Sequence, residues 1–393
     1  MIIAFWILLT VFLYSYFGYT LLLWLLSFFK RKKKTPQITE EDSLPEITLL
    51  VAAYNEKDVV ADKIRNSLEL NYPKGKLHLM WVTDGSDDGT NQELEKYENV
   101  EVLHKPGRSG KTAAINRAME FVKTPITIFC DANTVLNKDA VYNLALRFLD
   151  KKVGCVAGEK RIESKSKDNA PAAGEGFYWK YESVIKILES KVGWCMGAAG
   201  ELFALRTDLF QKVPDNSIID DFVISLTIAL KGYKIDYAPE AYSTETASGS
   251  IKDEMKRKVR IASGGFQTIF AMPQLFNFFK HFMLSWQFVS HKVSRWFFAP
   301  IALFFLFITN IIIVFQNQVI DFYSIFLVFQ ILMLILILIG STLRKKSTRL
   351  KIFFIPYYFF IMNYSQVLGL ITYIMGNHSV IWEKVNRQNK TEY

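Results

Sequence analysis

The chain has 393 residues, of which 50% are hydrophobic and 22% charged, and its formal net charge is +9. This length allows one large domain or two modest ones. The charge could indicate nucleic-acid binding, but the positive residues cluster beside apolar runs, at 30–34 and 344–346, as is typical of cytosolic loops in membrane proteins. We therefore exclude nucleic acid as an expected partner and expect membrane lipids instead.

The first element is an apolar segment, residues 1–30, with no charge between Ile2 and Phe29. It exceeds the roughly 20 residues that a membrane-spanning helix needs. A signal peptide is the alternative, but here the charges follow the apolar run and no small-residue cleavage site is evident. The basic residues 30–34 then predict an N-terminus outside a cell membrane and a cytosolic domain after it.

Residues 46–267 read as that cytosolic domain, because apolar strand-like runs alternate with helical patterns. Such alternation predicts an α/β fold with a mostly parallel sheet, whose ligands bind beyond the carboxyl ends of the strands. The expected strands are 47–53, 77–83, 100–104, 126–130 and 202–206, and the expected helices are 58–70, 111–122 and 138–149.

Polar residues follow the first two strands. The first strand ends in Ala53-Tyr54-Asn55-Glu56, and the second in the run 83–90, which contains Asp84 and three further polar or acidic side chains between glycines. Glycines let the backbone turn and approach a ligand, and carboxylates can accept hydrogen bonds from a ribose or a base. An ordinary turn and helix cap is the alternative for 83–90.

The fourth strand ends in Asp131-Ala132-Asn133. Two oxygen-bearing side chains at i and i+2 of an extended strand point the same way and can share a divalent cation that also binds a diphosphate. Asn133 offers a neutral oxygen where a carboxylate would bind more strongly, so a helix cap stays open as an alternative.

Residues 107–112 resemble the phosphate-binding loop of ATPases, but Lys105 occupies the position of its first glycine, so that pattern fails. The turn can still present backbone amides and Lys111 to phosphate. Further along, Gly197 to Gly200 form a small-residue segment that could admit a sugar or serve for close packing. The pair Asp220-Asp221 opens a helical run, where a carboxylate is either a cap or a general base.

The basic run 256–260 contains Arg257 and Arg260, which can hold a diphosphate by paired hydrogen bonds or face lipid headgroups. Residues 272–295 are predicted as an amphipathic interfacial helix. Residues 296–375 contain three segments long enough to span, 296–316, 322–341 and 352–375, and 376–393 form a tail.

These motifs, in this order, resemble the large family-2 glycosyltransferases, which include the cellulose, chitin, hyaluronan and poly-N-acetylglucosamine synthases. The resemblance covers roughly 46–267 and implies a GT-A nucleotide-sugar-binding domain. It implies that Ala53, Tyr54, Glu56 and Asp84 hold a uridine and that Lys111 approaches the diphosphate. It also implies that Asp131 and Asn133 carry Mg²⁺ or Mn²⁺, that Asp221 is the catalytic base, and that Arg260 with Arg257 stabilises the leaving group.

The chain departs from this family where processive members have Gln-x-x-Arg-Trp, because residues 257–261 read Arg-Lys-Val-Arg-Ile. The expected activity is an inverting, metal-dependent transfer from a UDP-sugar to a growing polysaccharide or glycan. Single-sugar transfer to a lipid carrier is the alternative enzyme. A non-catalytic scaffold or synthase subunit is the alternative from another class, and an accessory subunit or homo-oligomer is compatible with all three.

Overall fold

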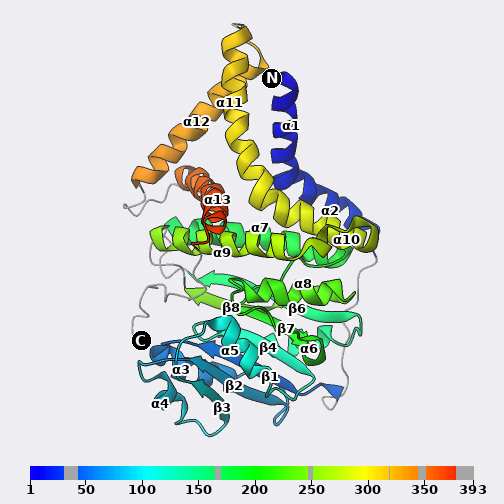
Figure 1. Cartoon of the computed structure of the whole chain (residues 1–393), viewed down its shortest axis with the longest axis vertical. Helices are drawn as coiled ribbons and strands as arrows, with labels where there is room; N and C mark the ends of the chain where they lie inside the picture. Colours follow the sequence, from blue (N-terminus) through cyan, green and yellow to red (C-terminus); the bar gives the residue numbers. More distant parts are fainter. Residues whose placement is uncertain (31–42, 164–169, 247–250, 318, 344–350, 378–393) are drawn as a thin grey trace.

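The computed structural model describes residues 1–30, 43–163, 170–246, 251–317, 319–343 and 351–377. The sheet and its helices form one part of the molecule, helices α7 and α9 form a layer across it, and α1, α11 and α12 extend beyond that layer (Figure 1). The expected α/β domain with additional membrane helices is confirmed. The basic residues 31–34 and 344–346 and nearly all of the tail 376–393 lie outside the described residues.

The central sheet has eight strands in the order β3-β2-β1-β4-β7-β6-β8-β5. The strands are β1 (Ile47–Ala53), β2 (Leu77–Asp84), β3 (Val100–Lys105), β4 (Ile126–Asp131), β5 (Val135–Leu136), β6 (Val153–Glu163), β7 (Leu202–Arg206) and β8 (Lys234–Thr246). Strands β3, β2, β1 and β4 pair in parallel, whereas β7 is antiparallel to both β4 and β6. The sheet is therefore mixed, with its parallel half on the side of the first motifs.

Every residue of β1 is buried, on both faces of the sheet, as its mostly apolar sequence favours. Ile47, Leu49 and Val51 pack into one core with helices α3 and α6, while Leu50 and Ala52 point into the other core. This alternation follows from the two-residue period of a strand. The parallel pairing of β1 with β2 and β4 places the ends of these strands side by side at one edge, where the predicted motifs begin.

The helices of the sheet domain cover these faces and carry most of the remaining motifs. They are α3 (Lys57–Leu68), α4 (Thr90–Leu94), α5 (Lys111–Ala118), α6 (Ala140–Arg147), α7 (Ala170–Val192), the 3₁₀ turn η3 (Thr207–Leu209), α8 (Asp220–Leu230) and α9 (Ile251–Ala271). Helices α7 and α9 were not predicted from the sequence. They separate the sheet from the apolar helices (Figure 1).

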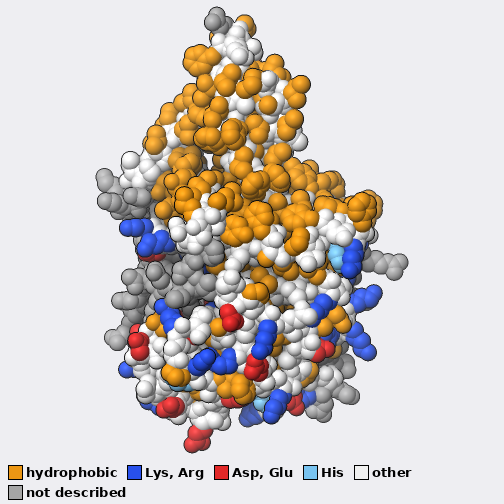
Figure 2. All heavy atoms as spheres, in the orientation of Figure 1, with side chains coloured by type: hydrophobic (Ala, Val, Ile, Leu, Met, Phe, Trp, Pro, Cys, Tyr) orange, Lys and Arg blue, Asp and Glu red, His pale blue; other side chains and the backbone are white. Residues whose placement is uncertain are grey.

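The remaining helices are apolar and carry the exposed hydrophobic surface that dominates one end of the molecule, while charged side chains gather on the other (Figure 2). They are α1 (Ile2–Leu13), η1 (Tyr14–Gly18), α2 (Tyr19–Phe28), η4 (Pro273–Phe276), α10 (Phe278–Phe288), η5 (Val289–Phe298), α11 (Ala299–Asn317), α12 (Phe322–Leu343) and α13 (Lys351–Ile374). Within the described residues, four stretches are long and apolar enough to cross a membrane: Ile2–Phe28, Phe278–Asn317, Phe322–Leu343 and Phe353–Ile374.

The segment predicted as an interfacial helix, 272–295, does not end before the following span. Helix α10, the π-helix η5 and α11 continue through Phe278–Asn317. The polar residues His291, Lys292 and Arg295 are buried against α7, where they contact Glu182. Their polarity therefore serves contacts within the protein, which explains why the sequence reads as amphipathic.

Candidate active site

The segments that follow β1 and β2 are joined to each other by hydrogen bonds. Asn55 has a φ of 54°, and its backbone N–H donates to Ser86 Oγ at 3.1 Å. Its side-chain amide exchanges two hydrogen bonds with Asp87, one to the carboxylate at 2.7 Å and one from the backbone N–H at 3.0 Å. Glu56 is buried, and its backbone N–H donates to Thr90 Oγ1 at 2.9 Å. These bonds fix Tyr54, at the end of β1 after the buried Ala53, beside the glycine-rich turn.

The carboxylate of Asp84 holds the turn that begins α5. One oxygen accepts from Ser109 N–H at 2.9 Å and the other from Gly110 N–H at 2.7 Å. Gly85 must be glycine here, since a Cβ would lie 2.7 Å from the carbonyl carbon of Gly107. The two predicted glycine turns are thus one structure, organised by Asp84.

Arg108 completes this side of the site. Its guanidinium carbon lies 3.8 Å from the centre of the Tyr54 ring. The sequence does not indicate Arg108, because nothing in it places residue 108 over residue 54. The stacked pair offers a flat surface at the ends of β1 and β2, suited to an aromatic base.

Three of the predicted residues meet at Gly200. Lys111, at the start of α5, donates from Nζ to Asp131 Oδ1 at 2.6 Å. A Cβ at Gly200 would lie 3.3 Å from Lys111 Nζ and 3.6 Å from Asp221 Oδ2. Side chains from α5, β4 and α8 therefore surround a residue whose missing side chain leaves room between them.

The charges around Gly200 influence one another. Burial by itself would lower the pKa of Lys111, but Asp131 and Asp220 raise it. Burial raises the pKa of Asp131, and the nearby Lys111 lowers it in part. The ammonium and the carboxylate thus form a partly buried ion pair, and groups with pKa values perturbed in this way are common at functional sites.

Asp221 is the predicted base, and its environment favours that role. Burial and the neighbouring Asp220 raise the pKa of Asp221 to about 7, against the opposing effect of Lys111. A general base works best with a pKa near the operating pH. Asp220 is itself buried, and its Oδ2 has no hydrogen-bond partner within the described part of the chain.

Arg260 faces the same acids from α9. Burial lowers its pKa, and the carboxylates of Asp220, Asp221 and Asp131 raise it in part, which places its guanidinium in their field. Its Nε is buried without a hydrogen-bond partner among the described residues. A guanidinium nitrogen without a partner, beside an acidic cluster, is suited to an anionic oxygen such as that of a phosphate.

Arg257 belongs to a neighbouring charge network. Its Nε donates to Glu254 at 3.1 Å, and its Nη1 lies 3.9 Å from Glu201. Lys160, which is fully buried, pairs with both Glu201 and Glu245. Burial would raise the pKa of Glu201, but Lys160 and Arg257 bring it well below its ordinary value. The structure thus ties Arg257 to the residue after Gly200, beside the cluster around Asp221.

The predicted metal ligands lie at the end of β4: Asp131 is its last residue, and Asn133 lies in the turn that follows instead of in an extended strand. Asn133 Oδ1 is buried without a hydrogen-bond partner, and it follows Asp131 by two residues. Lys63 holds this turn from α3 by donating to the carbonyl of Thr134 at 2.8 Å, a contact that the sequence did not indicate. No group of three or more His, Cys, Asp or Glu side chains that could hold a metal is found in the described ranges. Asp131 and Asn133 supply two oxygen-bearing side chains, and Mg²⁺ sites commonly take their other ligands from substrate phosphates and water.

Comparison with known proteins supports this fold. The mannosyltransferase PcManGT from Pyrobaculum calidifontis, solved in complex with GDP-Man and Mn²⁺, superposes with a TM-score of 0.68. The comparison covers 95% of this chain and 100% of that chain, at 20% sequence identity. The domain is accordingly a GT-A fold, the sheet architecture of one large class of glycosyltransferases.

Residues 45–264 match the family described as Glycosyltransferase like family 2, and the chain belongs to that family. The poly-beta-1,6-N-acetyl-D-glucosamine synthase of Staphylococcus aureus (strain MSSA476) is 30% identical over 248 residues, which cover 60% of this chain and 58% of that protein. The probable glycosyltransferase YdaM of Bacillus subtilis (strain 168) is 26% identical over 259 residues, with 60% and 59% covered. The chain thus matches less than two thirds of the length of these relatives.

Proposed function

We propose that this glycosyltransferase transfers a sugar from a UDP-sugar, with inversion, to a growing polysaccharide or another glycan acceptor at the cell membrane. The observation that carries the proposal is the meeting of Lys111, Asp131 and Asp221 around Gly200. A cation, a phosphate-binding ammonium and a base of suitable pKa would then border one small space. The relation to poly-beta-1,6-N-acetyl-D-glucosamine synthases makes UDP-N-acetylglucosamine the first donor to test.

The nucleotide would lie along the ends of β1 and β2. The base would stack on the surface that Tyr54 and Arg108 form together, and Glu56 would contact the uridine. Asp84 holds the turn 107–110 in place and would act through that turn as well as by direct contact. The diphosphate would then extend toward Lys111, at the N-terminus of α5, where backbone amides favour anions.

Asp131 and Asn133 would hold Mg²⁺ or Mn²⁺, and the neighbour PcManGT was solved with Mn²⁺. A divalent cation at this place would neutralise charge on the departing diphosphate. Arg260 would bind the same anion through its Nε, which has no hydrogen-bond partner among the described residues. Arg257 would contribute through Glu201, which it contacts.

Asp221 would accept the proton of an acceptor hydroxyl. The acceptor oxygen would form its bond to the anomeric carbon while the bond from that carbon to the phosphate oxygen breaks. The electron pair would leave with UDP and the proton would stay on Asp221. Attack from the face opposite the nucleotide inverts the anomeric configuration. Such a base typically contributes roughly 10²–10⁴-fold to the rate.

Single-sugar transfer to a lipid carrier is a second candidate, and Ile261 favours it. Processive relatives place a tryptophan where this chain has Ile261, which cannot stack on a sugar in the same way. The two candidates differ in their product, since only a polymerase lengthens a chain with time. A scaffold or synthase subunit without activity is the third candidate.

We propose a multi-pass protein of the cell membrane with the sheet domain in the cytosol, where the donor nucleotide would be bound. The four apolar stretches support the membrane location. The charged surface of the sheet domain, opposite the apolar end, supports its place in water (Figure 2). Membrane lipids are then direct partners, nucleic acid is not expected, and an accessory subunit or a second copy can pack against the exposed apolar helices.

The decisive experiment incubates the purified full-length protein with a panel of radiolabelled UDP-sugars, with Mg²⁺ or Mn²⁺, and measures both UDP release and product size. UDP release from one donor with long products supports a polysaccharide synthase. Additions of one sugar support the lipid-carrier alternative. If UDP binds but no donor turns over, and Asp221→Asn leaves the activity of a synthase complex unchanged, the scaffold candidate stands instead.

A further inference from the structure

Phe222, the residue after Asp221, is enclosed between the sheet domain and a helix that enters the membrane. On one side, a Cβ at Gly197 would lie only 2.2 Å from the Phe222 ring, so the backbone of Gly197 packs directly on that ring. On the other side, the Phe222 ring centre lies 5.4 Å from that of Trp296 and 6.4 Å from that of Phe288. Phe222 thus contacts both α10 and η5.

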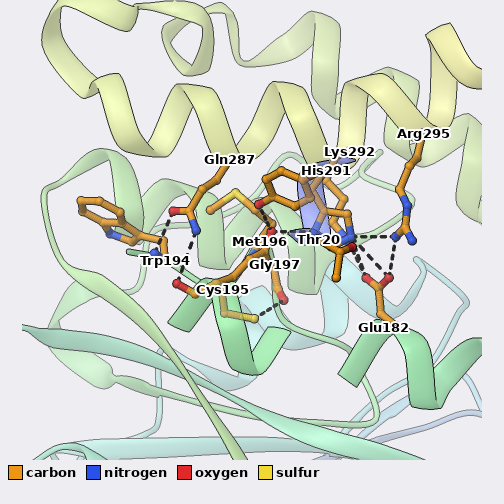
Figure 3. Close-up of polar contacts among 12 residues, drawn as sticks. Thr20, Glu182, Trp194, Cys195, Met196, Gly197, Gln287, His291, Lys292 and Arg295 are labelled. Atoms are coloured by element: carbon orange, nitrogen blue, oxygen red, sulfur yellow. Dashed lines mark hydrogen bonds and ion pairs between the residues drawn. The ribbon is translucent and has the colours of Figure 1, made fainter. Parts of the chain in front are cut away.

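The segment 194–196, just before Gly197, is hydrogen-bonded to the same helix. Gln287 of α10 accepts a hydrogen bond from the backbone N–H of Trp194 at 2.9 Å. Glu189 of α7 accepts one from the backbone N–H of Met196 at 2.9 Å. Gln287 also donates to the backbone carbonyl of Glu189 at 3.3 Å, and both side chains are fully buried. Figure 3 shows Gln287 reaching down from its helix to the turn 194–197.

Glu189 is in turn held by two apolar helices. Its carboxylate accepts from Tyr19 of α2 at 2.6 Å and lies 2.7 Å from His291 of η5. A second buried acid, Glu182 of α7, contacts His291, Lys292 at 3.0 Å and Arg295 at 2.9 Å, as Figure 3 shows. Buried polar networks in which each charge has a partner are rigid, because breaking one contact leaves a charge unpaired.

The donor side of the site depends on other contacts. Tyr54 packs under Arg108, and Asp84 binds the amides of Ser109 and Gly110. All these residues lie in the first half of the sheet domain. The turn 194–200 and the start of α8, by contrast, form the side on which Gly200 and Asp221 lie. The membrane helices therefore contact one half of the site through named bonds and rings.

We propose that the helix running from α10 through η5 into the membrane positions the carboxylate of Asp221, and that Phe222, Gln287, Glu189 and Trp296 are positioning residues for the acceptor half of the site. The proposal rests on the proposed function for the role of Asp221. Ala198 adds a further link, since its N–H donates at 3.1 Å to Ser225 of α8. A shift of α10 and η5 would thus move the base relative to the donor.

The test compares four full-length variants in lipid nanodiscs. Gln287→Met removes both hydrogen bonds at nearly constant volume, and Trp296→Leu removes the ring beside Phe222. Their matched controls are Gln274→Met and Phe298→Leu, at exposed positions of the neighbouring η4 and of η5 itself. The readouts are UDP release from UDP-N-acetylglucosamine and the affinity for UDP.

For Gln287→Met and Trp296→Leu we expect kcat to fall by about tenfold or more, since small displacements of reacting groups have large effects on rate. The donor KM and the affinity for UDP should stay within about twofold, because the donor half keeps its contacts. The controls should match wild type. Equal losses in UDP affinity and kcat, or the same losses in the controls, would overturn the proposal.

The pH dependence offers a readout that general destabilisation would not shift. Asp221 faces Asp220, Lys111, Glu201 and Arg260, and its burial is the largest cause of its raised pKa. Loosening Phe222 would let water approach Asp221, so the acidic limb of the rate profile should move to lower pH in the two variants. An unmoved limb together with a reduced kcat would point to loss of folded protein instead.

Hydrogen exchange separates this proposal from the proposed function, because it needs no turnover. In Gln287→Met and Trp296→Leu we expect faster exchange in 194–200 and 220–225 and unchanged exchange in 107–117 and 126–131. If wild type turned over no UDP-sugar, the function would fail while this pattern still supported the coupling. Unchanged exchange in 194–200 would refute the coupling even in an active enzyme.

Discussion

Lys111 Nζ lies 2.6 Å from Asp131 Oδ1, although the two residues begin and end different elements. The contact joins the glycine turn before α5 to the end of β4. It places the Lys111 ammonium at the carboxylate that is expected to bind a metal ion. On donor binding, Asp131 would therefore exchange Lys111 for the metal ion, and Lys111 would bind the phosphates.

Replacing Lys111 with methionine should weaken the donor site. Asp131 would lose its paired cation, and the diphosphate would lose a positive charge. We expect kcat/KM for the UDP-sugar to fall by about 10²-fold, in the range found for single groups that stabilise transition-state charge. Steady-state UDP release measures this. An unchanged kcat/KM would remove Lys111 from the site.

Asp221→Asn should lower transfer by roughly 10²–10⁴-fold while UDP still binds, since only the base is lost. In wild type, the rate should rise with pH through about 7, because burial and Asp220 raise the pKa of Asp221 to about 7 and the base must be ionised. A flat rate profile between about pH 5 and 8 would count against this assignment.

The same substitution should alter stability in a pH-dependent way. The pKa of Asp221 is raised above its ordinary value of 3.8, so the protonated form is favoured in the fold. That contribution is present at acidic pH and lost as pH rises through about 7. Asp221→Asn mimics the protonated form, so its melting temperature relative to wild type should increase from about pH 5 to about pH 8. Thermal unfolding in detergent at both pH values measures the change.

Asn133→Asp should tighten metal binding. The Asn133 oxygen is buried without a hydrogen-bond partner in the described structure, and a carboxylate there would add charge beside Asp131. We expect half-maximal activity at about tenfold lower Mn²⁺ concentration, because ligand charge governs affinity for hard cations. Metal titration of UDP release tests it. Weaker activation by metal in this variant would remove Asn133 from the proposed metal site.

Gly200→Ala should obstruct the space next to the base. The added Cβ would lie 3.3 Å from Lys111 Nζ, and the backbone of Gly200 needs no left-handed conformation. We expect a loss of transfer of at least about tenfold, because the Cβ would fill the space between the ammonium proposed to bind the diphosphate and the proposed base. Gly176→Ala is the control, since a Cβ there meets nothing within 4 Å.

Much of the sheet domain follows from local sequence. The run 47–53 is apolar except for Thr48 and forms β1 with those bounds, and the predicted strands 77–83, 100–104 and 126–130 differ from β2, β3 and β4 by one residue. A strand buried on both faces needs this composition whatever its neighbours are. Because a buried strand is mostly apolar, the polar residues that follow it mark its end and could be identified from the sequence.

Other features depend on partners far apart in the chain. Helices α7 and α9 were not expected, because several of their charged residues are buried in pairs such as Lys258 with Glu254 and Lys292 with Glu182. A sequence pattern shows a charge but not its partner. Arg108 and Lys63 were missed for this reason, since their roles lie in contacts with Tyr54 and Thr134.

The sequence by itself determined the order of the motifs along the chain, the family and the apolar stretches. These features depend on hydrophobic periodicity and turn residues, which act over short distances. Tertiary structure alone decided that Lys111, Asp131 and Asp221 meet around Gly200, and that Phe222 packs against Trp296. Burial and the mutual field of these charges set the pKa of Asp221, and both arise only when distant segments come together.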